Sequence, residues 1–190
     1  SERKHVEREL QALNARLEIL ATTDHLSGLS NRRRITEVLN DKMDQFNRYG
    51  RTFSIILLDI DHFKLINDSY GHQVGDRVIS ELGALLMSNI RTVDAVGRWG
   101  GEEFLIVCPE SNQAGALELA ELTRQRIENH DFGIARAVTA SCGLAVSRPG
   151  LTVNELIKAT DDALYRAKEL RNSVASAPFE PGFLTSGTKS

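Results

Sequence analysis

The sequence predicts an α/β protein (an α+β sandwich) with a mixed central β-sheet, flanking helices and a separate N-terminal helix. Short apolar runs rich in β-favouring residues alternate with stretches of helical periodicity, which is typical of one sheet with helices packed against it. Two of these runs are joined only across Gly100-Gly101, and so short a connection allows only antiparallel pairing. The sheet is therefore expected to be mixed.

Length and composition indicate one soluble globular domain with a real core and a short extra element. The chain has 190 residues, 41% of them hydrophobic and 26% charged, with a net charge of -3. This charge gives no electrostatic case for nucleic acid or an anionic membrane, and no apolar run approaches the ~20 residues of a membrane span. Cys108 and Cys142 lie in apolar runs, which predicts buried thiols and a cytoplasmic location, compatible with a membrane-anchored parent protein.

Residues 2–21 predict a helix with a narrow apolar seam. The seam residues are spaced 4, 3, 4 and 3 apart, as in a coiled coil: Val6, Leu10, Leu13, Leu17 and Leu20. The alternative is an amphipathic helix that lies on its own domain, but the strict, narrow seam favours pairing of two copies. Because the chain starts at Ser1 within this pattern, we expect a fragment whose upstream sensory domain is missing.

The order of the remaining elements predicts a βαββαβ core that is ferredoxin-like in outline. Ser30 or Asn31 is expected to cap the first of these helices, which ends before Gly50. The expected elements are a helix over 33–49, a strand over 52–60, a helix over 76–90, two strands within 94–109, a helix over 112–129, a strand over 137–147 and a helix over 152–170. We expect a signalling helix over 1–22, the folded domain over 23–175 and a loosely ordered tail over 176–190.

Asp59 and Asp61 mark the C-terminal end of the predicted buried strand. In sheets covered by helices, ligands usually bind at this end of the strands. Side chains alternate along a strand, so both carboxylates should point to one face. A carboxylate in this position is costly unless it is paired, hydrated or bound to a metal.

The segment 62–76 is dense in polar side chains. Lys64 can meet a phosphate as a point charge. The asparagine and aspartates of this segment offer donors and acceptors suited to a guanine edge. Gly71 and Gly75 are expected to make tight turns.

The stretch "RWGGEEF" (98–104) is either a plain hairpin or a site. Gly100-Gly101 fits a two-residue hairpin with positive φ, which is common. A tip without side chains also lets backbone N–H groups approach phosphate oxygens. Glu102 and Glu103 should lie on opposite faces, so one of them can turn toward Asp59, although strand parity does not decide which. An Asp and a Glu together make a hard-oxygen site suited to Mg²⁺, as phosphoryl transfer from a nucleotide requires.

Four ordered segments resemble the GGDEF-domain diguanylate cyclases. "GGEEF" (100–104) is similar to the family signature in its GGEEF form, and "DHLSGLSNRR" (24–33) is similar to the opening motif, with Ser27 in place of Thr. "DIDHFKLINDSYGHQVGD" (59–76) matches throughout, and "DDALYRAK" (161–168) resembles the closing helix. We expect the pair Asp24 and Arg33 to be a structural tie.

The resemblance implies a palm-type catalytic domain over 23–175 that condenses two GTP into cyclic di-GMP with release of pyrophosphate. The implied metal ligands for Mg²⁺ (or Mn²⁺) are Asp59, the Ile60 carbonyl, Glu102 and Glu103. Glu102 is also the implied base for the ribose 3′-hydroxyl, and Lys64 the second implied catalytic residue. The implied substrate-binding residues are Phe63, Lys64, Asn67, His72, Asp76, Gly100, Gly101, Lys168 and Arg171.

Two further segments bear on regulation and on substrate binding. "RTVD" resembles the family's inhibitory site, so the resemblance implies product inhibition through Arg91 and Asp94; an ordinary pair at a turn is the alternative. A gap-free alignment puts Leu122 where some members have a second arginine, with Arg124 and Arg126 close by. "KELRN" (168–172) is one residue shorter than the family's K-x-x-G-R-N and lacks its Gly, so whether Arg171 reaches the phosphates stays open.

The reaction itself predicts a homodimer, because the product is two-fold symmetric and two sites must face each other. The N-terminal heptads would raise the local concentration of one domain beside the other. Two alternatives remain: a non-catalytic module that senses GTP or cyclic di-GMP, and a related transferase that makes a mixed GTP/ATP product. We expect no nucleic acid partner and no membrane contact from this segment.

Overall fold

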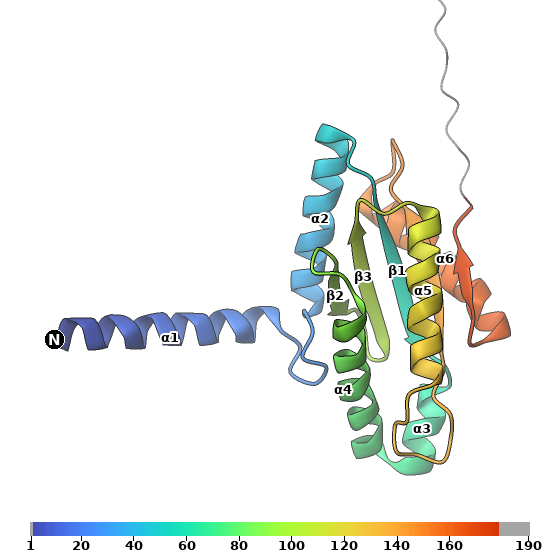
Figure 1. The fold of residues 1–190 in the computed structure, drawn as a ribbon, viewed down its shortest axis with the longest axis horizontal. Helices are drawn as coiled ribbons and strands as arrows, with labels where there is room; N and C mark the ends of the chain where they lie inside the picture. Colours follow the sequence, from blue (N-terminus) through green and yellow to red (C-terminus); the bar gives the residue numbers. More distant parts are fainter. Residues whose placement is uncertain (1, 179–190) are drawn as a thin grey trace, which may run out of the picture.

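The structure, a computed structural model, describes residues 2–178 and contains a five-stranded mixed sheet flanked by helices (Figure 1). The elements in chain order are α1 (Glu2–Thr22), α2 (Arg32–Tyr49), β1 (Phe53–Ile60), α3 (Phe63–Tyr70), α4 (His72–Asn89), β2 (Ala95–Arg98), β3 (Glu103–Pro109), α5 (Gln113–Glu128), β4 (Ala140–Val146), α6 (Val153–Leu170) and β5 (Val174–Ser176). The strand order is β2-β3-β1-β4-β5. All neighbours are antiparallel except β4 and β5, which confirms the mixed sheet and the ferredoxin-like core.

The central strand β1 is buried along its whole length and divides the core into two layers. Ile56, Leu58 and Ile60 face the layer that contains α4 and α5. Ile55 and Leu57 face the layer that contains α2 and α6. Strand alternation places Asp59 on the same side as Leu57, toward α6.

Two elements differ from the sequence-based expectation. The polar segment after β1 forms the separate helix α3, and Gly71, with φ of 88°, turns the chain directly into α4, so α4 begins at His72. At the C-terminal end, Val174–Ser176 adds β5 to the sheet, and the buried Ala177 donates its N–H to the Leu144 carbonyl. The rest of the predicted tail, 179–190, lies outside the described residues.

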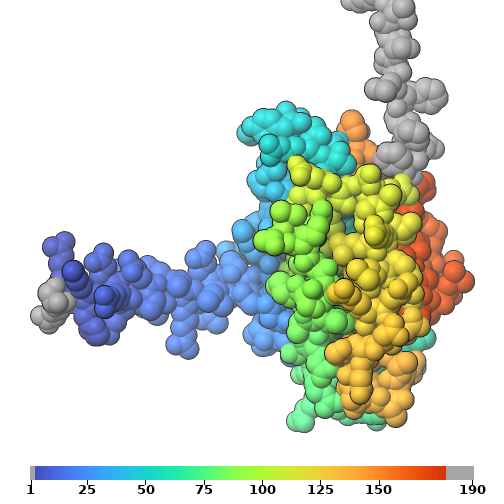
Figure 2. Space-filling model, viewed as in Figure 1, coloured from blue at the N-terminus to red at the C-terminus, as the bar shows by residue number. Residues whose placement is uncertain are grey.

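Helix α1 projects away from the rest of the molecule as a single arm (Figures 1 and 2). The seam residues Val6, Leu10, Leu13 and Leu17 are each 54–57% exposed, and Leu20 is 69% exposed. The alternative that this helix lies on its own domain is therefore wrong. Over residues 2–178, we find no helix with the length and apolarity that a membrane span requires.

The loop between α1 and α2 is fixed to the sheet. Asp24 accepts hydrogen bonds from the Ser27 N–H and hydroxyl, each at 2.8 Å, and pairs with the Arg98 guanidinium at 3.3 Å. The expected tie to Arg33 is wrong, because Arg33 lies on the exposed side of α2 and pairs with Glu37. Asn31 caps α2, and both cysteines are buried and free, as predicted.

Candidate active site

The β2–β3 hairpin lies directly beside β1, which was the condition for an acidic site. Asp59 is paired in register with Glu103, and the Ile60 N–H donates to the Glu102 carbonyl at 3.3 Å. The hairpin thus brings both glutamates to the C-terminal end of the central strand. At this end the polar side chains face the last turn of α6.

The glycine turn is not the two-residue, positive-φ hairpin expected from the sequence. Neither Gly100 nor Gly101 has a positive φ, and the N–H groups of Trp99 and Gly100 both donate to the Glu103 carbonyl. The connection is longer than two residues, so left-handed backbone is not needed. A Cβ at Gly100 would lie 2.7 Å from Glu103 Oε2, the end of a flexible side chain that can move aside, so fixed packing does not require glycine here either.

Arg98 holds this turn against the body of the domain. Its Nε and Nη2 donate to the Gly101 carbonyl at 3.2 and 2.8 Å, while Nη1 pairs with Asp24. One guanidinium therefore fixes both the glycine turn and the loop before α2. Sequence reasoning missed this residue, since nothing in the local pattern says which arginine the Asp24 carboxylate meets.

Three carboxylates at this end of the sheet have raised pKa values. Asp59 is only 4% exposed, and its burial raises its pKa despite the Lys168 ammonium 2.8 Å from its Oδ2. Burial also raises the pKa of Glu102 and of Glu103, and the negative charge of Asp59 adds to both shifts. The site therefore carries more negative charge than its own cations balance.

These donors fit a divalent cation that is shared with a phosphate ligand. Within residues 2–178, no three Asp, Glu, His or Cys side chains form a ready-made metal cage. Mg²⁺ rarely uses such a cage, because it is usually held by one or two carboxylates while phosphate oxygens and water complete its shell. Asp59, Glu102 and the Ile60 carbonyl are chemically suitable oxygen ligands for such an ion.

Basic groups reach the same end of the sheet from two helices. Lys168 and Arg171 come from the end of α6, and Arg171 Nη1 lies 3.6 Å from Asp61 Oδ1. Helix α3 begins only three residues after Ile60, with a buried Phe63 and an exposed Lys64 in its first turn. Of the predicted phosphate-binding residues, Lys168 and Arg171 contact the aspartates at the end of β1, whereas Lys64 lies exposed in the first turn of α3.

The predicted guanine-reading residues lie on α3 and α4. Asn67 is on α3, and His72 and Asp76 are exposed on α4. Gly75 was expected in a tight turn, but it lies within α4 and serves close packing. A Cβ at Gly75 would be 1.8 Å from Asn67 Oδ1, so only glycine lets the Asn67 amide lie beside the residue that precedes Asp76.

The R-x-x-D pair lies at the opposite end of β3 from the glycine turn. The Arg91 guanidinium donates to Asp94, with Nη2 2.7 Å from Oδ1, and to the carbonyl of Pro109, the last residue of β3. The Asp94 side chain is fully buried, whereas the Arg91 side chain is 55% exposed. Arg91 is therefore the member of the pair that a ligand from solvent would meet first.

The two arginines near the predicted second inhibitory position are already engaged. Arg124 pairs with Glu121 and Glu128, and Arg126 with Asn89. Leu122, at the aligned position, is exposed. Both arginines therefore already have a side-chain partner, although Arg126 is exposed.

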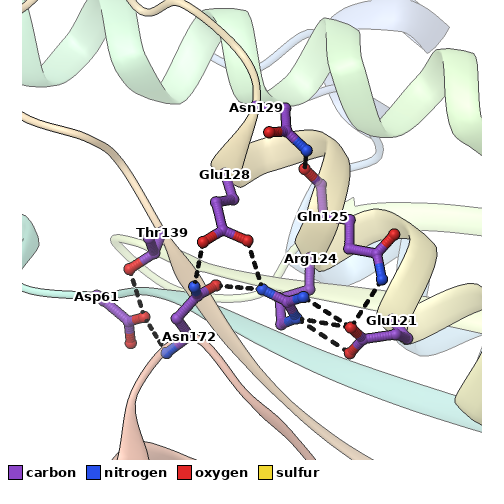
Figure 3. Close-up of polar contacts among 8 residues, drawn as sticks. All are labelled: Asp61, Glu121, Arg124, Gln125, Glu128, Asn129, Thr139 and Asn172. Atoms are coloured by element: carbon purple, nitrogen blue, oxygen red, sulfur yellow. Dashed lines mark hydrogen bonds and ion pairs between the residues drawn. The ribbon is translucent and has the colours of Figure 1, made fainter.

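Asp61 forms a second polar centre that sequence reasoning did not separate from Asp59. It is 3% exposed and accepts hydrogen bonds from the Thr139 and Ser141 hydroxyls and from the Asn172 N–H, at 2.7–2.8 Å. The Asn172 side chain continues to Arg124 and Glu128 on α5 (Figure 3). The repeated Asp in "DID" was a signal, but its partners lie about eighty and more residues away in the sequence.

Comparisons with known proteins agree with this geometry. Residues 21–173 match the family model "Diguanylate cyclase, GGDEF domain". The chain is 40% identical over 162 residues to the response regulator PleD of Caulobacter vibrioides, and 39% identical over 170 residues to the diguanylate cyclase DgcM of Escherichia coli. These alignments cover 82% and 89% of this chain but only 36% and 42% of the two relatives.

A solved structure is similar over nearly the whole chain. The coiled coil and GGDEF domain of DgcB from Caulobacter crescentus, in complex with c-di-GMP, superimposes with a TM-score of 0.84 at 30% identity. The match covers 93% of this chain and 95% of that one, which includes the projecting helix as well as the domain. On the match to the family model and the identity to its relatives, this chain belongs to the GGDEF family.

Proposed function

We propose that this chain is a diguanylate cyclase domain, which condenses two GTP into cyclic di-GMP and releases pyrophosphate. The observation that carries the proposal is the excess of carboxylates at the end of β1 and β3, beside a turn without side chains and the cations of α6. A nucleotide triphosphate with a divalent cation complements this arrangement in charge. The same complete set of groups favours catalysis over a module that only senses nucleotide.

In the proposed reaction, Glu102 takes the proton from the ribose 3′-hydroxyl of one GTP. Its raised pKa brings the carboxylate closer to the operating pH, which makes it a better base. The 3′-oxygen then bonds to the α-phosphorus of the other GTP, and the bond from that phosphorus to the bridging oxygen of pyrophosphate breaks. The reaction occurs twice, so each GTP is attacked once and attacks once.

The remaining groups hold the substrate. Mg²⁺ (or Mn²⁺), bound by Asp59, the Ile60 carbonyl and Glu102, with Glu103 beside them, would neutralise phosphate charge. Lys64, Lys168 and Arg171 orient the terminal phosphates and stabilise the leaving pyrophosphate. Gly100 and Gly101 leave room for the phosphates and ribose.

The guanine of GTP is recognised by residues of α3 and α4. Asn67 and Asp76 read the guanine edge, with His72 nearby, and the backbone around Phe63 holds the β- and γ-phosphates together with Lys64. The close packing of Asn67 on Gly75 supports this assignment, because it holds a polar side chain against its neighbour helix at a defined position.

Two copies of the chain must meet, and α1 offers the surface for this. Its exposed seam is covered when a second α1 packs against it as a coiled coil. We propose that an upstream sensory region controls this pairing. We also propose that cyclic di-GMP inhibits the enzyme by binding at Arg91 and Asp94, on the exposed guanidinium side of the pair.

The test is incubation of the chain with GTP and Mg²⁺, followed by separation of the nucleotides. Wild type and a control variant on the exposed face of α5, Glu118→Ala, are expected to form cyclic di-GMP, and Glu102→Ala none. Product only at high protein concentration would mean that the catalytic groups are sound and that pairing of two chains limits the rate. Absence of product at every concentration, with GTP or cyclic di-GMP still bound, would favour the sensing module.

A further inference from the structure

The turn that ends α6 contains a backbone conformation that arginine rarely adopts. Arg171 has φ of 59° and ψ of 160°, a region in which nearly all residues are glycine. Asn172 follows with φ of 44°, which an asparagine tolerates more easily. Such strain persists only where the surrounding structure holds the chain in place.

Asp61 and Asn172 supply several of the contacts that hold this turn. The Asn172 N–H donates to Asp61 Oδ2 at 2.8 Å, and the other Asp61 oxygen accepts from the Ser141 hydroxyl at 2.7 Å. The Asn172 side chain accepts from Arg124 at 2.7 Å and donates to Glu128 at 2.8 Å (Figure 3). The turn is thus fixed from the sheet on one side and from α5 on the other.

The fixed turn determines where two cations lie. Lys168, in the last turn of α6, pairs with Asp59, and Arg171, in the strained position, lies beside Asp61. The two aspartates at the end of β1 thus face one cation each. Asp59 has a raised pKa, whereas Asp61 is satisfied by hydroxyl and backbone donors. Asp61 is therefore suited to hold the turn rather than to bind a ligand.

We propose that Asp61 and Asn172 are positioning residues for phosphate binding. By holding the strained turn, they place Arg171 and Lys168 against the terminal phosphates of GTP, in a chain whose closing turn lacks a glycine. This inference rests on the proposed function, because it takes the acidic site to be the nucleotide site. It differs from a simple tie between α5 and α6, which would affect stability and not the recognition of particular phosphates.

The first experiment compares two nucleotides that differ only in those phosphates. Binding of GMP is measured beside that of a GTP analogue with a methylene bridge between the α- and β-phosphorus, which cannot release pyrophosphate. For Asp61→Asn we expect the analogue to bind about tenfold more weakly, as for other residues that orient binding groups, and GMP to bind as in wild type. Asn172→Gly, which keeps the Asp61 carboxylate but removes the contacts to Arg124 and Glu128, should show the same selective loss, in case the first variant does not fold.

Arg126→Ala is the matched control, because Arg126 lies on the same helix as Arg124 but contacts Asn89 and not Asn172. It should bind both nucleotides as wild type does. Equal weakening of both nucleotides in the Asp61 and Asn172 variants, or no change in either, would overturn the proposal.

The second experiment uses the strain itself. Arg171→Gly removes both the guanidinium and the strain, whereas Arg171→Ala removes only the guanidinium. Both should lose affinity for the analogue, but the glycine variant should unfold about 2–4 °C higher than the alanine variant. Equal unfolding temperatures would show that the turn is not held against strain, and would overturn the proposal.

Turnover of GTP by wild type separates this inference from the proposed function. If wild type makes cyclic di-GMP while Asp61→Asn keeps the wild-type preference for the analogue, only the positioning role fails. If wild type makes no product, but its preference for the analogue over GMP is lost in Asp61→Asn, only the cyclase assignment fails.

Discussion

Two groups of carboxylates in this domain differ in how their charge is balanced. At the end of β1 and β3, burial raises the pKa of Asp59, Glu102 and Glu103, and the negative charge of Asp59 adds to the shifts of both glutamates. In the loop before α2, burial also acts to raise the pKa of Asp24. There, hydrogen bonds from Ser27 and the charge of Arg98 outweigh the effect of burial, so the pKa of Asp24 is lowered.

The difference separates a candidate binding site, Asp59 with Glu102 and Glu103, from a structural brace, the Asp24–Arg98 pair. Asp24 gains stability from being ionised in the folded protein, whereas the acidic group loses stability until a cation joins it. Both groups are tied to the same hairpin, since Arg98 contacts Asp24 and the Gly101 carbonyl. The Asp24–Arg98 pair can therefore hold in place the glycine turn that positions Glu102 and Glu103. Four predictions test this comparison, beginning with the largest effect.

Glu102→Gln should lower the initial rate of cyclic di-GMP formation by about 10²–10⁴-fold, the usual effect of losing a general base. The same change removes a charge that Asp59 repels, so the unfolding temperature at pH 7 should stay level or rise. Product formation and thermal unfolding measured on the same preparation check both parts. A loss of activity accompanied by a lower unfolding temperature would show that Glu102 stabilises the fold, as Asp24 does, and would contradict the prediction.

Asp24→Asn should act in the opposite way and lower the free energy of unfolding by about 1.5–3 kcal/mol, the range for hydrogen bonds to charged groups. Because the folded pKa is lowered, this contribution is present above the ordinary value near 3.8 and disappears as the pH falls through the folded pKa. Urea unfolding at several pH values should therefore show a gap at neutral pH that closes in acid. Asp44→Asn, on an exposed part of α2, is the control and should show little change at any pH.

The brace and the site were not equally visible in the sequence. Strong local patterns predicted β1, β3 and the antiparallel hairpin, and they brought Asp59 and the glutamates to one end of the sheet. Helix α3 was missed because its short polar segment buries only Phe63 and Ile66, too few residues to define a helical period. Strand β5 was missed because three residues give no readable alternation.

Partners that are distant in the sequence could not be predicted. Asp24 has several arginines within reach along the chain, and only the pairing of Ser30 with Gly97 brings Arg98 to it. Asp61 depends on Ser141 and Asn172, which are supplied by β4 and by the turn after α6. Such contacts follow from the sheet order, which local periodicity does not determine.

A third prediction concerns the other charged pair attached to β3. The Asp94 carboxylate is buried behind Arg91, so the exposed guanidinium should be the main contact for a bound product. Arg91→Ala should raise the concentration of cyclic di-GMP needed for half inhibition on the order of tenfold, equivalent to about 1.4 kcal/mol. Inhibition curves for wild type, Arg91→Ala and Arg126→Ala check this, and equal sensitivity of all three would exclude Arg91 from the inhibitory site.

The smallest effect is the pH dependence of stability at the acidic site. The folded pKa of Glu102 and of Glu103 is raised above the ordinary value of 4.5, so in a window above that value the folded protein binds more protons than the unfolded chain. Wild type should therefore lose stability relative to the Glu102→Gln/Glu103→Gln variant as the pH rises through this window, and the two should converge in acid. This slope is opposite in sign to that of Asp24, so the two groups can be distinguished in one series of unfolding curves. Mg²⁺ added at pH 7 should stabilise wild type more than the variant, because only wild type has the uncompensated charge, and equal responses would mean that repulsion among these carboxylates does not create the cation site.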